Sequence, residues 1–228
     1  LRLVFSFSFL AFHLPPSFYT INDMKTTLLI LASLLLTGTL SAQLDPTAGH
    51  RYGIRSAIIK KETKSMAGAI ANTLYFDNFG DREATEMTMK MGEEEKHLRV
   101  VAEDGGRMNV TLDLDQKKAF RMPAPDQPRN FRQLSPEDIE RFKIKEVGTG
   151  DVAGKPCKKY EMELTQSGVK LQATVWIWEG IMLRYEARYQ GNLMVTDEAS
   201  EVEENVAVPA DKFAIPAEVK VEAAPSMN

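Results

Sequence analysis

The chain has few of the residues that thiol and soft-metal chemistry require. Its 228 residues include one cysteine, Cys157, and three histidines, His13, His50 and His97. A single cysteine excludes an intramolecular disulfide and a cysteine-rich zinc site. Neither His50 nor His97 has a neighbour in sequence that suits it for acid–base catalysis. We therefore predict no catalytic residue, no metal ligand and no cofactor, and we do not expect an enzyme.

The sequence also has no net positive charge and no long apolar run. The formal net charge is −4 at pH 7, with 43% hydrophobic and 26% charged residues, which is ordinary for a folded globular chain. A mildly acidic protein is a poor electrostatic partner for nucleic acid. The apolar stretch Leu28–Leu36 is far shorter than the roughly 20 residues that a spanning helix needs. We expect no nucleic-acid binding and no transmembrane anchor in the mature chain.

The layout of a secretory signal peptide begins at Met24. Met24-Lys25 supplies the basic start, Leu28–Leu36 the apolar centre and Thr37–Ala42 the region of small residues. Cleavage after Ser41 and cleavage after Ala42 both remain open. The layout predicts an exported protein.

The domain organisation follows from this signal. Residues 1–23 begin with leucine and precede a complete signal peptide, so we interpret them as an upstream extension from a translation start placed too early; a long export signal with two apolar segments is the alternative. The signal peptide is predicted at 24–42. A single β domain is predicted over 43–228, with its core at about 51–216.

Alternation of apolar and polar residues predicts a mainly β domain. The clearest hairpin turns at Asp104-Gly105-Gly106, where positive φ angles cost little. The last two predicted strands carry apolar residues at odd positions and mostly polar ones at even positions, which indicates an antiparallel sheet covered on one face only. The strands are expected at 51–63, 69–77, 86–91, 96–103, 108–114, 117–122, 156–165, 169–178 and 181–190.

One α-helix is expected from about Pro136 to Phe142. Ser135 can cap its first turn, Pro136 suits the first helical position, and acidic residues follow. The helix is too short to be stable alone and must dock through Ile139 and Phe142. Beyond it, the acidic segment 197–205 is assigned no strand, 209–213 is expected to form a helical turn, and the tail after 221 is expected to fray.

One short motif resembles a nucleotide-binding signature. Gly148–Ala153 matches G-x-G-x-x-A, but Gly154-Lys155-Pro156 then leads into a β-rich segment rather than the required helix. We interpret the motif as a glycine-rich turn entering a strand.

The apolar strand faces are the candidate ligand site. Most of the 11 methionines lie in or beside predicted strands, and flexible thioethers either line adaptable apolar surfaces or fill ordinary cores. Both interpretations stay open. The residues predicted to line a hydrophobic cavity are Met87, Met89, Leu98, Val100, Met108, Val110, Leu112, Leu171, Val175, Ile177, Leu183 and Tyr185.

Two tryptophans form a second candidate site. Trp176 and Trp178 fall on the otherwise polar face of their strand, so they form either an exposed contact patch for a partner or a surface covered by another segment. Cys157 is expected to be a buried small apolar residue, with a disulfide between two chains or a reactive thiol as the alternatives.

Four short motifs carry a resemblance to a known family: Tyr75–Gly80, Gly154–Tyr160, Val175–Trp178 and the ending from Glu204 to Pro216. Over about residues 51–216 the chain is similar to a periplasmic domain family of unknown function from Gram-negative bacteria, which itself resembles the lipoprotein carriers LolA and LolB. The resemblance implies a strongly curved, antiparallel sheet, a half-open barrel with one or two short helices, whose apolar concave side holds acyl chains. It implies a location in the periplasm or associated with the outer membrane of a Gram-negative bacterium, and it implies no catalytic residue. No arginine here matches the carriers' lid arginine.

Three functions are compared. The leading hypothesis is an exported, non-enzymatic protein that binds or carries a lipid, a lipoprotein acyl chain or another hydrophobic ligand in the curved sheet. The alternative is a structural or interaction module of the cell envelope, without a ligand, that contacts an envelope protein through Trp176 and Trp178. An envelope hydrolase with dispersed carboxylates is the least favoured, because the sequence singles out no pair of acids.

Overall fold

The computed structural model describes residues 47–91, 94–166 and 168–223. All of them belong to one compact unit. The predicted signal peptide and upstream extension lie outside the described residues. As expected, the fold is mainly β: within the described ranges, twelve strands form one open sheet, accompanied by one α-helix and three 3₁₀ turns.

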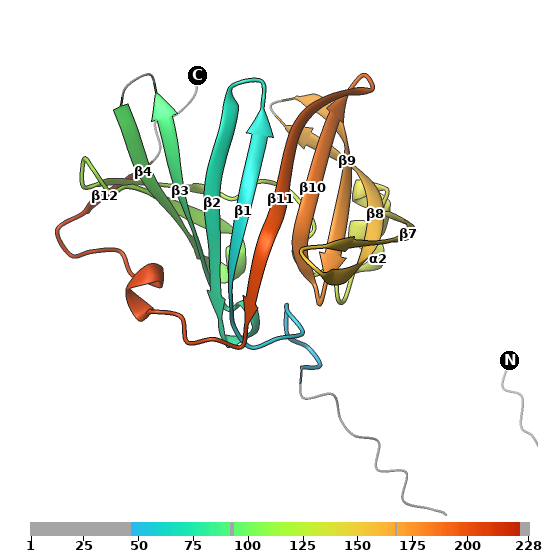
Figure 1. The fold of residues 1–228 in the computed structure, drawn as a ribbon, viewed down its shortest axis with the longest axis horizontal. Coiled ribbons are helices and arrows are strands. Elements are labelled where there is room, and N and C mark those ends of the chain that lie inside the picture. Colours follow the sequence, from blue (N-terminus) through green and yellow to red (C-terminus); the bar gives the residue numbers. More distant parts are fainter. Residues whose placement is uncertain (1–46, 92–93, 167, 224–228) are drawn as a thin grey trace, which may run out of the picture. The chain divides into compact units, whose positions relative to one another are not determined.

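The sheet has the strand order β12-β6-β5-β4-β3-β2-β1-β11-β10-β9-β8-β7. Neighbouring strands are antiparallel, except for β12, which runs parallel to β6. The chain forms one meander from β1 to β6, continues through α2, and then forms a second meander from β7 to β11 (Figure 1). The two meanders join where β11 pairs with β1. The strands are β1 Ala57–Ser65, β2 Gly68–Asp77, β3 Arg82–Met91, β4 Glu94–Glu103, β5 Met108–Asp113, β6 Lys118–Pro123, β7 Lys145–Val152, β8 Lys155–Gln166, β9 Val169–Trp178, β10 Ile181–Tyr189, β11 Asn192–Glu204 and β12 Lys220–Ala223; the helical elements are η1 Asn78–Gly80, η2 Asp104–Gly106, α2 Pro136–Phe142 and η3 Ala210–Phe213.

The sheet is strongly curved. The pairing register shifts between Lys60 and Lys61 and again between Met182 and Arg184, and such bulges bend a strand and increase its twist. As a result β7 reaches β11, although three strands separate them in the sheet. An ion pair of 2.8 Å between Lys155, the first residue of β8, and Glu204, the last residue of β11, also connects these strands.

The tight turn between β9 and β10 requires a glycine. Glu179 and Gly180 both have positive φ angles, 49° and 82°, as a two-residue hairpin turn demands. A Cβ atom on Gly180 would lie 2.6 Å from the backbone oxygen of Arg51, closer than carbon and oxygen can approach. The glycine therefore brings the N-terminal segment against the β9–β10 turn, where Gly53 N donates to Glu179 O at 2.8 Å.

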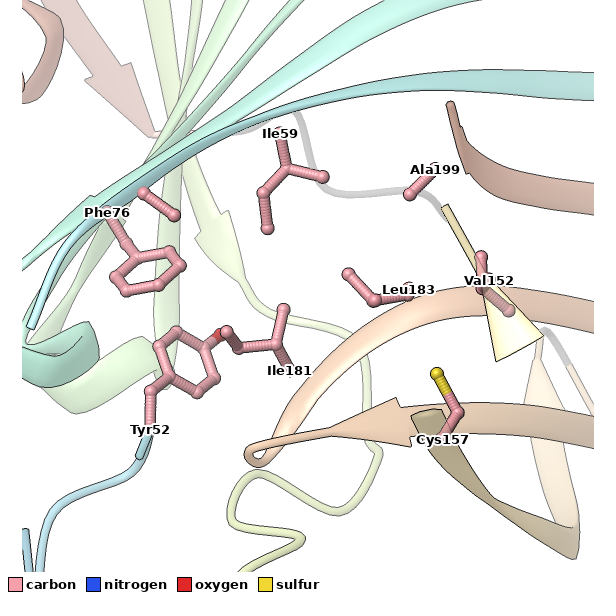
Figure 2. Close-up of a cluster of buried hydrophobic side chains, with 9 residues drawn as sticks. Tyr52, Ile59, Phe76, Val152, Cys157, Ile181, Leu183 and Ala199 are labelled. Atoms are coloured by element: carbon pink, nitrogen blue, oxygen red, sulfur yellow. The ribbon is translucent and has the colours of Figure 1, made fainter. Parts of the chain in front are cut away.

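Buried side chains form three clusters. The first lies where β1, β2 and β11 meet β7, β8 and β10, and Figure 2 shows Tyr52 beside Phe76 and the thiol of Cys157 directed into the cluster. The second packs the loop before α2, and α2 itself, against β8 and β9. The third lies on β3 to β6 under the C-terminal segment, where Phe213 and Ile215 cover Val110 and Leu112.

The expectation that the sheet is covered on one face only is wrong. Phe76 pairs with Glu83 and belongs to the first cluster, whereas its chain neighbour Tyr75 pairs with Ala84 of the third cluster. Consecutive strand residues point to opposite faces, so the two clusters lie on opposite sides of β2 and β3. The C-terminal segment covers the second face of the sheet, and its sequence, interrupted by Pro209 and Pro216, gave no periodic signal of that role.

The local predictions agree with the structure in most elements. The helix is α2 as predicted, with Ser135 Oγ accepting from Asp138 N at 3.0 Å and Pro136 in the first turn. Phe142 docks the helix, but Ile139 is 43% exposed. The turn of helix expected at 209–213 is η3.

Three strands were not predicted. The glycine-rich motif at 148–153 lies largely within β7 rather than forming only a turn, and the tail expected to fray after 221 includes the second half of β12. The acidic segment belongs to β11, a central strand. Ion pairs to neighbouring strands explain how it tolerates its acids, with Lys60 2.7 Å from Glu201 and Arg184 3.5 Å from Glu198.

Candidate functional site

A cleft of about 810 Å³ opens between the α2 segment and strands β7 to β9. This volume is within the range of roughly 300–1,000 Å³ that is typical of small-molecule sites. Its apolar lining comes from Phe131, Leu134, Ile139, Ile144, Pro156, Tyr160, Ile177 and Trp178, and the other lining residues are Arg132, Glu146, Thr149, Cys157, Lys158, Glu179 and Gly180.

Helix α2 and its flanking loop form one wall. Phe142 is only 5% exposed and holds the helix on the second cluster, which leaves Ile139 on a surface that lines the cleft. Ile139 and Phe142 are three residues apart on the helix, so their side chains project in neighbouring but different directions. Phe142 can therefore be buried while Ile139 stays accessible. Ile139 is therefore an apolar side chain that protein atoms cover only in part.

Strands β8 and β9 form the opposite wall. Tyr160 pairs with Val175, and the Tyr160 and Phe131 rings lie 5.8 Å apart at an interplanar angle of 43°. Ile177 and Trp178 continue the lining toward the β9–β10 turn. The rings and aliphatic chains give a surface that suits an apolar ligand.

Four charged residues also line the cleft: Arg132, Glu146, Lys158 and Glu179. Lys158 Nζ is 3.4 Å from Glu146 Oε2, and both side chains are largely exposed. Burial, followed by the negative charge of Glu146, raises the pKa of the Tyr160 phenol above its ordinary value. Tyr160 is therefore a neutral hydroxyl group at pH 7.

Cys157 is not suited to act as a nucleophile. Its side chain is 2% exposed, and Sγ donates to the backbone oxygen of Lys155 at 3.4 Å. Burial raises the pKa of the thiol to about 11, so the thiolate is scarce near neutral pH. The residue fills the first cluster, as expected for a small apolar side chain.

Only one of the twelve residues predicted to line a cavity, Ile177, lines this cleft. Val175 and Tyr185 lie in or against the second cluster beneath it, and Leu183 is fully buried in the first cluster. Leu171 pairs with Leu164.

The remaining predicted residues lie on β3, β4 and β5, divided between two faces. Met87 pairs with Leu98, and Met89 and Val100 share their face. Val110 and Leu112 instead pair with Val101 and Arg99, on the opposite face of β4, and are buried under the C-terminal segment. Met108 shares that face, paired with Glu103. The twelve residues thus do not form one continuous lining.

The two tryptophans are half-buried and their rings are engaged within the molecule. The guanidinium carbon of Arg184 lies 4.6 Å from the Trp176 ring centre, and Lys159 Nζ lies 5.0 Å from the same centre. Lys155 Nζ lies 4.8 Å from the Trp178 ring. Both tryptophans pack against the first cluster, so neither is a fully exposed contact residue.

Sequence reasoning missed most of the cleft because its walls include a segment without periodicity. Phe131 and Leu134 lie in the proline-containing loop before α2, and Ile144 follows the helix. Isolated large apolar residues on both sides of a short helix were the available signal.

In the ranges that the structure describes, no group of three or more His, Cys, Asp or Glu side chains could hold a metal ion. No helix of the described residues is long and apolar enough to cross a membrane.

No protein-family model matches the chain, and no curated protein matches it. Similar solved structures include an uncharacterized conserved protein from Thermus thermophilus, at 10% identity and a TM-score of 0.49, covering 74% of this chain and 90% of that one. They also include the MucA/MucB complex of Pseudomonas aeruginosa, at 13% identity and 0.48, covering 73% and 58%, so the chain spans less than two thirds of that protein. LprF from Mycobacterium bovis matches at 11% identity and 0.35, covering 69% and 89%.

Proposed function

We propose that this protein is an exported, non-enzymatic binding protein of the cell envelope, and that the cleft beside α2 holds the acyl chain of a lipid or a similar apolar ligand. The observation that carries the proposal is the cleft itself, which has about 810 Å³ of space and a lining that is largely aromatic and aliphatic. The proposed site differs from the one expected from the sequence. The cleft is bounded by α2, the loop before α2 and strands β7 to β9, whereas the expected site was the apolar faces of the strands.

The lining supports an apolar chain rather than a polar ligand. Burial of each methylene of a ligand contributes about 0.8 kcal/mol, so a chain of several methylenes gains enough to offset the cost of immobilising it. Ile139 lies where such a chain would gain contact, because it lines the cleft and is still 43% exposed. The buried thiol and the neutral Tyr160 add no charge that would oppose an apolar ligand.

The alternative, a module that binds an envelope protein through Trp176 and Trp178, has less support. Cations already cover the rings of both tryptophans, and both pack against a buried cluster. A partner would have to displace these contacts before it could use the rings.

A matched pair of substitutions tests the proposal. Ile139 and Val147 are both 43% exposed, but only Ile139 lines the cleft. Ile139→Glu places a carboxylate against the bound chain and removes burial of one or two methylenes, about 1–2 kcal/mol, so affinity should fall about tenfold or more. Val147→Glu adds the same charge on the edge strand β7 and should change affinity less than about twofold.

The measurement is the fluorescence enhancement of 11-(dansylamino)undecanoic acid titrated with each protein. Far-UV circular dichroism of each variant verifies the fold. If the parent protein does not bind the probe saturably, or if both variants bind as tightly as the parent, the acyl-binding proposal is wrong. Loss of binding in Val147→Glu alone would place the ligand elsewhere and also contradict it.

A further inference from the structure

A second, much smaller cavity lies where the loop between β6 and α2 meets the N-terminal segment and the turn between β4 and β5. Its volume is about 90 Å³. It shares no lining residue with the large cleft, so an inference about it does not rest on the proposed function. Its walls are formed by Arg51, Glu83, Ala102, Gly106, Asn109, Ala124, Pro125, Gln127, Pro128 and Arg129.

One cationic nitrogen of this cavity has unused hydrogen-bonding capacity. Arg129 Nη1 is buried and has no hydrogen-bond partner in the structure. No carboxylate of the described residues forms an ion pair with Arg129. Buried donors are nearly always satisfied, and a charged donor is the most costly to leave without a partner. The nitrogen therefore points to an anionic acceptor.

A second guanidinium group faces the same place. A Cβ atom built on Gly106 would lie 3.7 Å from Arg51 Nη1 and 3.8 Å from Arg129 Nη1. Both nitrogens thus lie within 4 Å of one point beside a residue that has no side chain. Because Gly106 has no side chain, no Cβ atom fills the space beside the two nitrogens.

Neighbouring carboxylates compensate Arg51 more than Arg129. Arg51 Nη1 is 3.2 Å from Glu83 Oε2, which also accepts a hydrogen bond from the Tyr52 hydroxyl. Arg51 Nε donates to the backbone oxygen of Arg129 at 3.0 Å, which fixes the two residues relative to each other. Asp104, whose pKa is lowered mainly by its hydrogen bonds from Arg107 and slightly by Arg129, is engaged by Arg107 at 2.7 and 2.9 Å. The positive charge of Arg129 is left the least neutralised.

We propose that this cavity binds a phosphate group, held by Arg129 and Arg51 with the side-chain amides of Asn109 and Gln127 as further donors. A phosphate has several acceptor oxygens that can meet donors from different directions, and guanidinium groups bind it with charge-assisted hydrogen bonds. A cavity of about 90 Å³ holds a group of a few heavy atoms but not a nucleotide. The phosphate is either the free ion or the headgroup of a phospholipid.

Isothermal titration of the full-length folded protein with inorganic phosphate, and separately with dihexanoylphosphatidic acid, tests the site. Arg129→Gln should weaken binding at least tenfold, and Arg129→Lys, which keeps the charge but loses the planar fork, should weaken it severalfold. Arg188→Gln is the matched control, because Arg188 is 42% exposed, pairs with Glu186 on β10 and does not line the cavity, and it should bind within about twofold of the parent.

Arg129-dependent binding of inorganic phosphate supports a site for the free ion, and Arg129-dependent binding of the phospholipid alone supports a headgroup site. The proposal is overturned if neither probe binds the parent, if Arg129→Gln and Arg188→Gln weaken binding equally, or if Arg129→Lys binds like the parent when Arg129→Gln does not fold. Uptake of the dansyl fatty acid should be unchanged in Arg129→Gln, which separates failure of this site from failure of the cleft.

Discussion

Phe142 is the residue on which the cleft wall depends, and Phe142→Ala should both destabilise the protein and weaken ligand binding. Helix α2 has seven residues, too few to persist without tertiary contacts. Phe142 is 5% exposed in the second cluster, where substitution of a buried phenylalanine by alanine costs about 3–5 kcal/mol. The helix can settle toward the space left behind, so we expect the lower end, about 3 kcal/mol.

Small domains unfold at a cost of roughly 5–15 kcal/mol, so the Phe142→Ala variant should remain folded at 25 °C. Urea unfolding followed by far-UV circular dichroism gives the change in free energy. Glu140→Ala, an exposed substitution in the same helix, is the control and should stay within about 0.5 kcal/mol of the parent. Affinity for the dansyl fatty acid should fall only in Phe142→Ala, because Ile139 loses its fixed place in the wall.

A destabilisation below about 1 kcal/mol for Phe142→Ala would show that the helix is not held by this side chain. Full destabilisation with unchanged probe affinity would show instead that α2 does not bound the ligand site. Either result refutes the role assigned to the helix.

Three further predictions concern other parts of the chain. Burial raises the pKa of Glu86, but hydrogen bonds from Lys212 and Arg99 lower it more, so the pKa is below its ordinary value. The stabilisation that the charged Glu86 gives to the folded state is therefore present at neutral pH and should be lost as pH falls below about 4.3. Glu86→Gln should reduce that acid sensitivity in urea midpoints measured against pH, and an unchanged slope contradicts the assignment. With a pKa of about 11, the Cys157 thiol should react with iodoacetamide at pH 8 at least tenfold more slowly in the native protein than in urea, and equal rates would mean that it is accessible. Gly180→Ala should lower the free energy of unfolding by more than about 1 kcal/mol, because of its φ of +82° and the backbone oxygen 2.6 Å from the new Cβ; a neutral result in calorimetry would contradict the turn.

Local signals in the sequence predicted local structure well. Ser135 and Pro136 specify where α2 begins, and alternation identified most strands of both meanders. The pairing of β11 with β1 was not predictable from alternation, because its acids are tolerated through lysines and arginines on other strands. Such pairs exist only after the sheet has formed, and a single sequence does not display them.

The candidate site was predicted less well than the fold, for a related reason. Methionine-rich alternation pointed to the faces of β3 to β5, where the register divides the residues between two faces and the C-terminal segment buries one of them. The cleft is instead bounded by Phe131, Leu134 and Ile139, which belong to a loop and a short helix. Where a loop lies over a sheet depends on long-range packing that residue spacing does not encode.

The pairing of β1 with β11 has a consequence for how the chain acquires its structure. Ala57 pairs with Glu204, so the middle of the sheet joins the first strand to one that leaves the ribosome nearly 150 residues later. Until then β1 has an unpaired edge, and the loop-closure entropy of this long connection delays the final pairing. A chain truncated before residue 192 lacks β11 and would leave this edge of β1 open to pairing with other chains.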